Sequence, residues 1–181
     1  TAQNLKELWV PDNDSRGEDN GQVVIIGGSE LFTGAPLLSL IAASRLVDMV
    51  FLATPDTDRG AAEKTVLFSK LKAVVWIPRE ELDAYIEKAD AVLIGPGMMR
   101  YHSENTKFET LNPKQFDEKG TETRMLTQYL LSRYPDKKWV IHGRSLQVIE
   151  PKWIPAGSVI TPNRKEYETL FNEQFTMENV Q

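Results

Sequence analysis

The sequence predicts an α/β fold of three layers, in which helices flank a mostly parallel central sheet. Two observations lead to this prediction. Short runs rich in β-branched residues recur along the chain, and amphipathic helical patterns lie between them. The first of these runs, residues 22–26, is continuously apolar after Gln22, as is typical of a central strand that is covered on both faces.

Each expected element has a local signal. The strands are short apolar runs, several of them stopped by Pro or Gly, at residues 22–26, 49–53, 73–77, 91–94, 139–141 and 158–160. The helices show apolar residues at helical spacing and lie at residues 35–46, 79–88, 122–133 and 163–171. In the last helix Asn163 is the N-cap residue and Glu166 follows at the third helical position, which is a variant of the capping box.

Two polar segments lie outside these strands and helices. Residues 1–21 predict a short helix and then a connector of turn-forming and charged residues. Residues 100–120 lack a clear period and predict a long surface loop, and such loops are usually functional lids or disordered segments. No linker rich in Gly, Ser or Pro divides the chain, so residues 1–181 are expected to form a single domain.

Composition and charge exclude several classes of function. The 181 residues carry a formal net charge of −5 and include no cysteine, which excludes disulfide scaffolds, Cys-ligated zinc, iron–sulfur clusters and thiol nucleophiles. Lys and Arg are scattered, and no run approaches the roughly 20 apolar residues of a membrane span, so neither nucleic acid nor a membrane is an expected partner. Two histidines leave little material for a metal site, and none is predicted. A cytoplasmic location is the simplest expectation.

The most informative motif follows the first strand. The chain passes through Gly27, Gly28 and Ser29, and then through residues 33–35 into a helix whose first turn contains Pro36. Glycine lets a backbone approach a ligand closely, and the amides at a helix start favour an anion or a polar ligand edge. The motif is neither the dinucleotide fingerprint nor a P-loop. The alternative is that these glycines only form a tight turn.

Two further motifs lie at strand ends. Gly95-Pro96-Gly97 follows the strand at residues 91–94, and residues 161–163 lead from the last strand into a helix. Ligands of open α/β sheets bind beyond the carboxyl ends of the strands, so the two glycine-rich loops predict one shared crevice. The alternatives are a rigid turn for the first motif and a simple helix cap for the second.

The histidines and three of the tryptophans are expected to have structural rather than functional roles. His142, at the end of a strand, and His102, in the long loop, have no partner pattern for catalysis and are expected to be polar residues. Trp76, Trp139 and Trp153 lie on or beside strands and are expected to be core residues rather than platforms for base stacking.

Taken together and in their order, the motifs resemble the ribokinase-like family of ADP- or ATP-dependent NAD(P)H-hydrate dehydratases. The resemblance spans residues 15–171 and is carried by NGQVVIIGGSELFTGAP at 20–36, ADAVLIGPG at 89–97 and TPNRKE at 161–166. It implies a ribokinase-like fold. It also implies a homo-oligomer whose partners are small nucleotide ligands.

The resemblance implies a reaction and a site. In that family ADP or ATP, with Mg²⁺, phosphorylates the hydroxyl of hydrated NADH or NADPH, and the loss of phosphate restores the cofactor. Asn163 stands where the family usually has a substrate-contacting His. The residues that would line the pocket for the hydrated nicotinamide are Gly28, Ser29, Thr33, Gly34, Ala35 and Gly97.

The chain departs from the family at three points. The family's Gly-Leu-Gly is Gly97-Met98-Met99 here, and its Asp-Ala-Asp-Ala-Leu is the segment HGRSL at residues 142–146. The family's Gly-Thr-Gly-Asp, which supplies an anion hole and a catalytic base, does not occur in the 181 residues.

No catalytic residue is therefore assigned. The chain alone is expected to be inactive and C-terminally incomplete relative to the family. A small-molecule or vitamin kinase of the same fold and a non-catalytic nucleotide-binding or assembly protein are the alternatives.

Overall fold

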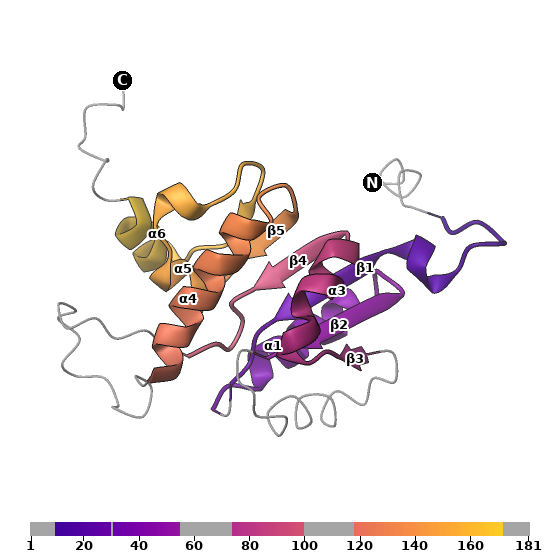
Figure 1. Cartoon of the computed structure of the whole chain (residues 1–181), viewed down its shortest axis with the longest axis horizontal. Helices are drawn as coiled ribbons and strands as arrows, with labels where there is room; N and C mark the ends of the chain where they lie inside the picture. Colours follow the sequence, from indigo (N-terminus) through magenta and orange to yellow (C-terminus); the bar gives the residue numbers. More distant parts are fainter. Residues whose placement is uncertain (1–9, 30, 55–73, 100–117, 172–181) are drawn as a thin grey trace.

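A six-stranded sheet organises the protein (Figure 1). The computed structural model describes residues 10–29, 31–54, 74–99 and 118–171. The strands are β1 (Gln22–Ile26), β2 (Met49–Ala53), β3 (Val74–Trp76), β4 (Ala91–Ile94), β5 (Lys138–Ile141) and β6 (Val159–Ile160). Their order is β3-β2-β1-β4-β5-β6, and every pairing is parallel, so the described sheet is parallel throughout rather than mostly parallel.

The central position of β1 is confirmed. It pairs with β2 on one side and with β4 on the other, which places Ile25 between Leu52 and Leu93. Val24, Ile25 and Ile26 are fully buried. Successive side chains of a strand point to opposite faces, so a strand that is covered on both faces is apolar at every position.

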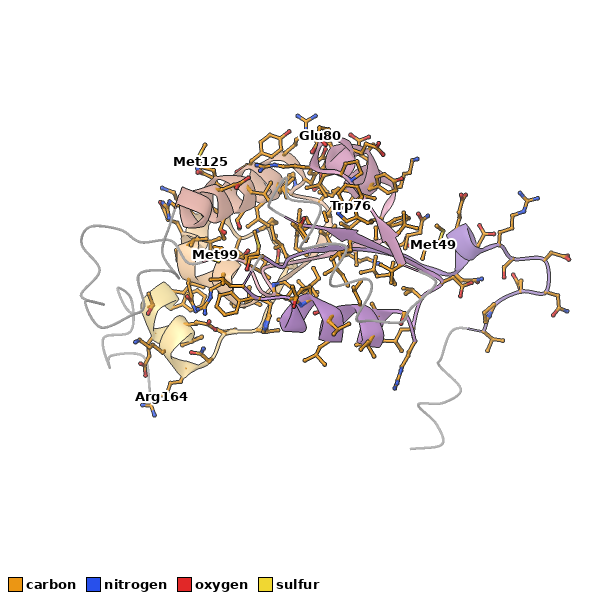
Figure 2. The ribbon with its side chains drawn as sticks, turned by 90° about the horizontal axis from the view of Figure 1, so that it is seen from below. Met49, Trp76, Glu80, Met99, Met125 and Arg164 are labelled. Carbon is orange, nitrogen blue, oxygen red and sulfur yellow. The ribbon has the colours of Figure 1, made fainter. Side chains whose placement is uncertain are left out.

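Helices lie on both sides of the sheet, which gives the predicted three layers. They are α1 (Gly34–Ala43), α3 (Leu82–Lys88), α4 (Glu118–Arg133), α5 (Arg144–Val148) and α6 (Arg164–Phe171), with 3₁₀ turns η2 (Gly17–Asn20), η3 (Arg79–Glu81) and η5 (Pro151–Trp153). Figure 2 shows the sheet from its edge, with α1 on one face and α3 and α4 on the other.

Two hydrophobic clusters fill the spaces between these layers. The smaller one joins Leu40 of α1 to Ile25 of β1. The larger one joins the opposite face of β1 to α3 and α4 and includes Ile86, Leu130 and Trp139. Burial of one Leu or Ile side chain stabilises the fold by about 1.5–3 kcal/mol relative to leaving that side chain exposed. The two clusters therefore hold the helices against the sheet.

The tryptophans differ in burial. Trp139 is 1% exposed, as predicted for a core residue, and its Nε1–H donates to the carbonyl of Tyr134 at 2.8 Å. Trp153 is half-buried and packs against the larger cluster, with the guanidinium of Arg124 4.6 Å from its ring centre. Trp76 is half-buried on the edge strand β3. The expectation of a core role is therefore met fully only by Trp139.

One predicted helix is too long. The pattern predicts a helix over residues 35–46, but α1 ends at Ala43. Arg45 and Leu46 donate their backbone N–H to carbonyls three residues earlier, which tightens the last turn and ends the helix. Leu46 is 83% exposed, so the apolar residue that extended the pattern is not part of the buried face.

One helix is not predicted. α5 follows β5 directly and buries Ser145, Leu146 and Val148. Five residues are too few to show a helical period, which explains why the sequence does not reveal it.

The two polar segments also differ from expectation. α4 begins at Glu118, so the last three residues of the predicted loop 100–120 are helical, and its residues 100–117 lie outside the described residues. Within the predicted N-terminal connector η2 forms a helical turn, and the short helix expected before the connector falls largely in residues 1–9, which are also outside. His102 lies outside as well.

Candidate functional site

A pocket of about 660 Å³ lies beyond the carboxyl ends of four strands. Its walls come from the segments that follow β1, β4, β5 and β6, because the carboxyl ends of parallel strands meet at one edge of a sheet. The lining residues are Leu31, Phe32, Thr33, Gly34, Ala35, Pro96, Gly97, Met98, His142, Gly143, Arg144, Gln147, Thr161, Asn163 and Glu166. The two glycine-rich loops thus share one pocket, as the sequence predicts.

Direct backbone contacts join these two loops. The N–H of Gly28 donates to the carbonyl of Pro96 at 2.7 Å. Gly97 has a φ of +72°, and a Cβ at that position would lie 2.5 Å from the carbonyl oxygen of Phe32. Only glycine fits this approach without strain, so part of the glycine pattern serves the packing of one loop on the other.

Ser29 reinforces the same junction. Its side chain is 2% exposed, and its hydroxyl donates to the carbonyl of Gly97 at 2.9 Å. The N–H of Phe32 in turn donates to the Ser29 hydroxyl at 3.2 Å. Ser29 therefore links the loop after β1 to the loop after β4.

The predicted site residues fall into two groups. Gly28 and Ser29 are buried and lie outside the lining. The residues in the lining, brought together from three separate motifs, are Thr33, Gly34, Ala35, Gly97 and Asn163.

Asn163 has a local role as well as a place in the pocket. Its side-chain oxygen accepts the N–H of Glu166 at 3.0 Å, and its own N–H donates to the Glu166 carboxylate at 2.9 Å. The predicted capping box of α6 is thus confirmed, and it fixes both residues at the N-terminus of the helix.

Sequence reasoning missed the wall that follows β5. His142, Gly143, Arg144 and Gln147 all line the pocket. Nδ1 of His142 lies 2.7 Å from the hydroxyl of Thr161, which also belongs to the lining. The available signal was the departure of residues 142–144 from the family pattern, which marked the segment without indicating a binding role.

The methionines after Gly97 are buried. Met98 is 0% and Met99 5% exposed, although Met98 also contributes to the lining. The sulfur of Met98 accepts a hydrogen bond from the hydroxyl of Ser145 at 3.6 Å. Gly97 therefore remains at the pocket, because the bulky residues that follow it fill the interior.

The charged residues of the lining are few. Among the described residues of the lining they are Arg144 and Glu166. Both oxygens of Glu166 accept hydrogen bonds, one from the side chain of Gln147 and one from the N–H of Asn163. The described lining thus contains a guanidinium and a carboxylate, and each has hydrogen-bond partners.

These residues do not form a magnesium site by themselves. Protein-bound Mg²⁺ uses one or two carboxylates and draws its remaining ligands from phosphates and water. Among the described residues no group of three or more His, Asp or Glu is placed to hold a metal ion, and Glu166 is the single carboxylate in the lining.

The described helices do not include one that is long and apolar enough to cross a membrane.

Two curated proteins with the same description are similar to this chain. The bifunctional NAD(P)H-hydrate repair enzyme Nnr of Hyperthermus butylicus is 29% identical over 164 residues, which are 85% of this chain and 27% of that enzyme. The corresponding enzyme of Methanocaldococcus jannaschii is 25% identical over 181 residues, 97% of this chain and 33% of that enzyme. The chain thus spans about a third or less of the length of these relatives.

Solved structures show the fold. A ribokinase-like superfamily protein from Enterococcus faecalis V583 matches with a TM-score of 0.68 at 20% identity, covering 98% of this chain and 58% of that one. The ADP/ATP-dependent NAD(P)H-hydrate dehydratase from Bacillus subtilis, co-crystallized with ATP/Mg²⁺, matches with a TM-score of 0.62 at 16% identity, covering 96% and 58%. The fold is therefore ribokinase-like.

The sequence profile of a protein family matches residues 23–180, which is most of the chain. The protein therefore belongs to the NAD(P)H-hydrate dehydratase family.

Proposed function

We propose that this chain forms the substrate-holding part of a site that restores NAD(P)H from its hydrate in an ADP- or ATP-dependent reaction. One observation carries the proposal. Three motifs that are far apart in the sequence bring Thr33, Gly97 and Asn163 into the lining of one pocket. These are the motifs on which the resemblance to the dehydratases rests, and they meet where an α/β sheet binds its ligands.

The chemistry explains why a nucleotide is needed. Hydroxide is a poor leaving group. The hydroxyl oxygen of the hydrate attacks the terminal phosphorus of ADP or ATP, the bond from that phosphorus to the bridging oxygen breaks, and the hydroxyl proton passes to a base. The carbon–oxygen bond then breaks with the departure of phosphate, and loss of a proton from the neighbouring carbon restores the dihydronicotinamide.

This chain's own residues would hold and enclose the substrate. Gly34 and Ala35 start α1 and have no bulky side chain, so a planar ring can approach their backbone amides. Gly97 offers the same access from the opposite loop. In this proposal these residues position the hydrate, and the proton transfer and phosphoryl transfer need further groups.

Among the residues that the structure describes, those further groups are absent from the pocket lining. Glu166 is the single carboxylate among these described lining residues, and both of its oxygens accept hydrogen bonds. The family motif Gly-Thr-Gly-Asp does not occur in the 181 residues. Loss of one oxyanion-type donor reduces turnover by roughly 100- to 1,000-fold, so the chain alone should bind the hydrate without measurable turnover.

The test combines binding with catalysis. Calorimetric titration of the 181-residue chain with NADH hydrate should give saturable binding. The absorbance of NADH should not rise when ADP or ATP is added. Fusion to a C-terminal segment of the family that carries Gly-Thr-Gly-Asp should produce a nucleotide-dependent rise.

The matched control is the same fusion with Asn in place of the aspartate of that motif, which should stay at background. Absence of hydrate binding to the 181-residue chain would overturn the proposal. Nucleotide-dependent turnover by the unfused chain, above a no-enzyme control, would show that the chain has catalytic groups of its own, which contradicts the proposal.

A second candidate is a binding protein without catalysis. The engaged carboxylate of Glu166 and the cation of Arg144 in the lining favour it, because neither supplies a base for a hydroxyl proton. The fusion experiment separates the two candidates. A non-catalytic protein would bind nucleotide-like ligands and would stay inactive after fusion.

A further inference from the structure

His142 lines the pocket directly after β5, and the neighbouring strands fix its backbone. Its N–H donates to the carbonyl of Ile94 at 2.9 Å, and its own carbonyl packs so closely on Gly95 that a Cβ there would overlap it. Thr161, which follows β6, donates its N–H to the carbonyl of Ile141 at 3.2 Å. The parallel strands therefore place His142 and Thr161 next to each other at the carboxyl edge of the sheet.

The imidazole of His142 has a defined orientation. Its Nδ1 lies 2.7 Å from the hydroxyl oxygen of Thr161. With the ring turned over, a carbon would lie at that distance from the oxygen, which is much closer than carbon and oxygen normally approach. Nδ1 is therefore the nitrogen that faces Thr161. Among the residues that the structure describes, the other ring nitrogen, Nε2, has no hydrogen-bond partner.

The hydroxyl of Thr161 decides where the ring proton lies. This hydroxyl can donate to Nδ1 at 2.7 Å or to the carbonyl of Ile141 at 3.5 Å. The second distance is beyond the usual range for an O–H donor, and that carbonyl already accepts the N–H of Thr161. The hydroxyl proton therefore goes to Nδ1, so the neutral ring carries its own proton on Nε2. A protonated ring also has a proton on Nε2, so this nitrogen is a donor in either charge state.

We propose that His142 is a specificity-determining residue whose Nε2–H donates a hydrogen bond to an oxygen of the ligand in this pocket. Thr161 is the positioning residue that orients the ring. A donor at this place selects for a ligand that presents an oxygen, because a ligand N–H at the same place would leave two donors unpaired. The identity of the ligand as an NAD(P)H hydrate or a nucleotide rests on the proposed function.

Two parts of these ligands offer an acceptor oxygen. One is the carboxamide carbonyl of the hydrated nicotinamide. The other is a phosphate oxygen of the dinucleotide or of ADP or ATP. ADP-ribose contains the phosphates and both riboses of NADH without the nicotinamide ring. Comparison of NADH hydrate with ADP-ribose therefore separates the two sources.

The position of the ring proton can be measured without any ligand. Heteronuclear NMR that correlates the ring nitrogens with the ring C–H protons distinguishes a protonated nitrogen from an unprotonated one. The chain has two histidines, so His102→Gln assigns the remaining ring signals to His142. At alkaline pH, where imidazole is neutral, the proton should lie on Nε2. A proton on Nδ1 would overturn the inference.

The binding experiment compares four variants of the full chain. His142→Phe keeps a ring and removes both nitrogens, His142→Gln keeps an N–H donor, and Thr161→Val removes the hydroxyl while the shape stays nearly the same. Thr169→Val is the matched control, because Thr169 is exposed on α6, donates its hydroxyl to the carbonyl of Lys165 and lies outside the lining. Circular dichroism melting checks that each variant is folded, and calorimetry measures the Kd for NADH hydrate, ADP-ribose and ADP.

The size of the effect depends on the acceptor. A carbonyl acceptor predicts that His142→Phe raises the Kd for NADH hydrate by roughly threefold to tenfold, and a phosphate acceptor predicts more than about tenfold, because hydrogen bonds to charged groups are stronger. An unchanged Kd for ADP-ribose in the same variant identifies the nicotinamide carbonyl as the acceptor. An equal loss for ADP-ribose identifies the phosphates of the dinucleotide, and a loss for ADP identifies the nucleotide.

The other variants separate a ligand contact from a structural role. His142→Gln should restore part of the affinity that His142→Phe loses. Thr161→Val should raise the Kd by a smaller factor, and it should have no further effect in the His142→Phe background, because its effect passes through the ring. Thr169→Val should leave the Kd unchanged. His142 is exposed, so none of these changes removes a core contact.

Two binding results would overturn the inference. One is that His142→Phe leaves the Kd unchanged for every probe that binds, and the other is that Thr161→Val and Thr169→Val change the Kd equally. Failure of the proposed function is distinct. If NADH hydrate does not bind but the Kd for ADP or ADP-ribose depends on His142, the proposed function fails and the donor role of His142 stands. If none of the three probes binds the original chain, both are wrong.

Discussion

Asn163 and Glu166 cap α6 reciprocally at the edge of the pocket, with hydrogen bonds of 3.0 and 2.9 Å between the backbone of each and the side chain of the other. The same two residues belong to the pocket lining. Helix stability and pocket shape are therefore coupled at this point of the structure.

Asn163→Ala should destabilise the protein by about 0.5–2 kcal/mol, because the N–H of Glu166 loses its acceptor at the helix start. Asn163→Ser retains a capping oxygen and should lie within about 0.5 kcal/mol of the original chain. Urea unfolding of the variants at neutral pH measures both values. Equal losses for Ala and Ser would show that the side-chain cap contributes little.

Gly97→Ala should be more damaging than the matched change at Gly157. Both glycines have positive φ, +72° and +79°, so each alanine adds backbone strain of about 1–2 kcal/mol. At Gly157 the added methyl meets open space, whereas at Gly97 it meets the carbonyl of Phe32. The difference in unfolding free energy between the two variants isolates that steric contact, and a difference near zero would contradict the tight junction of the loops.

Ala35→Trp should block the pocket while the fold stays cooperative. Ala35 is exposed and lines the pocket, so the indole fills space where the ligand would lie rather than space in the core. The Kd for NADH hydrate should rise at least tenfold, which corresponds to about 1.4 kcal/mol. Ala42→Trp is the control, since Ala42 is exposed on the same helix outside the lining. Unchanged affinity in folded Ala35→Trp would remove this loop from the site.

Glu150 should contribute stability that depends on pH. Hydrogen bonding and charge from Lys152, followed by Arg124, lower the pKa of Glu150 below its ordinary value of 4.5. A group whose pKa is lower in the folded protein stabilises the fold above its unfolded pKa and loses that contribution as the pH falls through the folded pKa. The excess stability of the original chain over Glu150→Gln, from urea unfolding, should therefore be present at pH 7.

That excess should disappear as the pH falls below about 4.5, because the carboxylate becomes protonated. Lys152→Met removes the first partner and should shrink the excess at pH 7. An excess that remains constant between pH 7 and pH 3 would contradict the assignment of the lowered pKa to these ion pairs.

The local elements were predictable to different degrees. The apolar run of β1 indicates a strand that is covered on both faces, and Asn163 with Glu166 indicates the start of α6, because both signals depend on neighbouring residues alone. The end of α1 was not predictable from Leu46. Leu46 continues the apolar pattern of the helix but is 83% exposed, and the backbone hydrogen bonds of Arg45 and Leu46 to carbonyls three residues earlier end the helix before it.

The α/β class, the glycine loops at the strand ends and the candidates Thr33, Gly97 and Asn163 could be predicted from short stretches of sequence. It took the folded chain to show that Arg144 and Gln147 line the same pocket and that Ser29 is buried, with its hydroxyl bonded to the carbonyl of Gly97. These features depend on the strand order, which places β4, β5 and β6 side by side, and on the close backbone packing of one loop on the next. Neither is encoded in any short stretch of residues, since both arise from contacts between segments far apart in the chain.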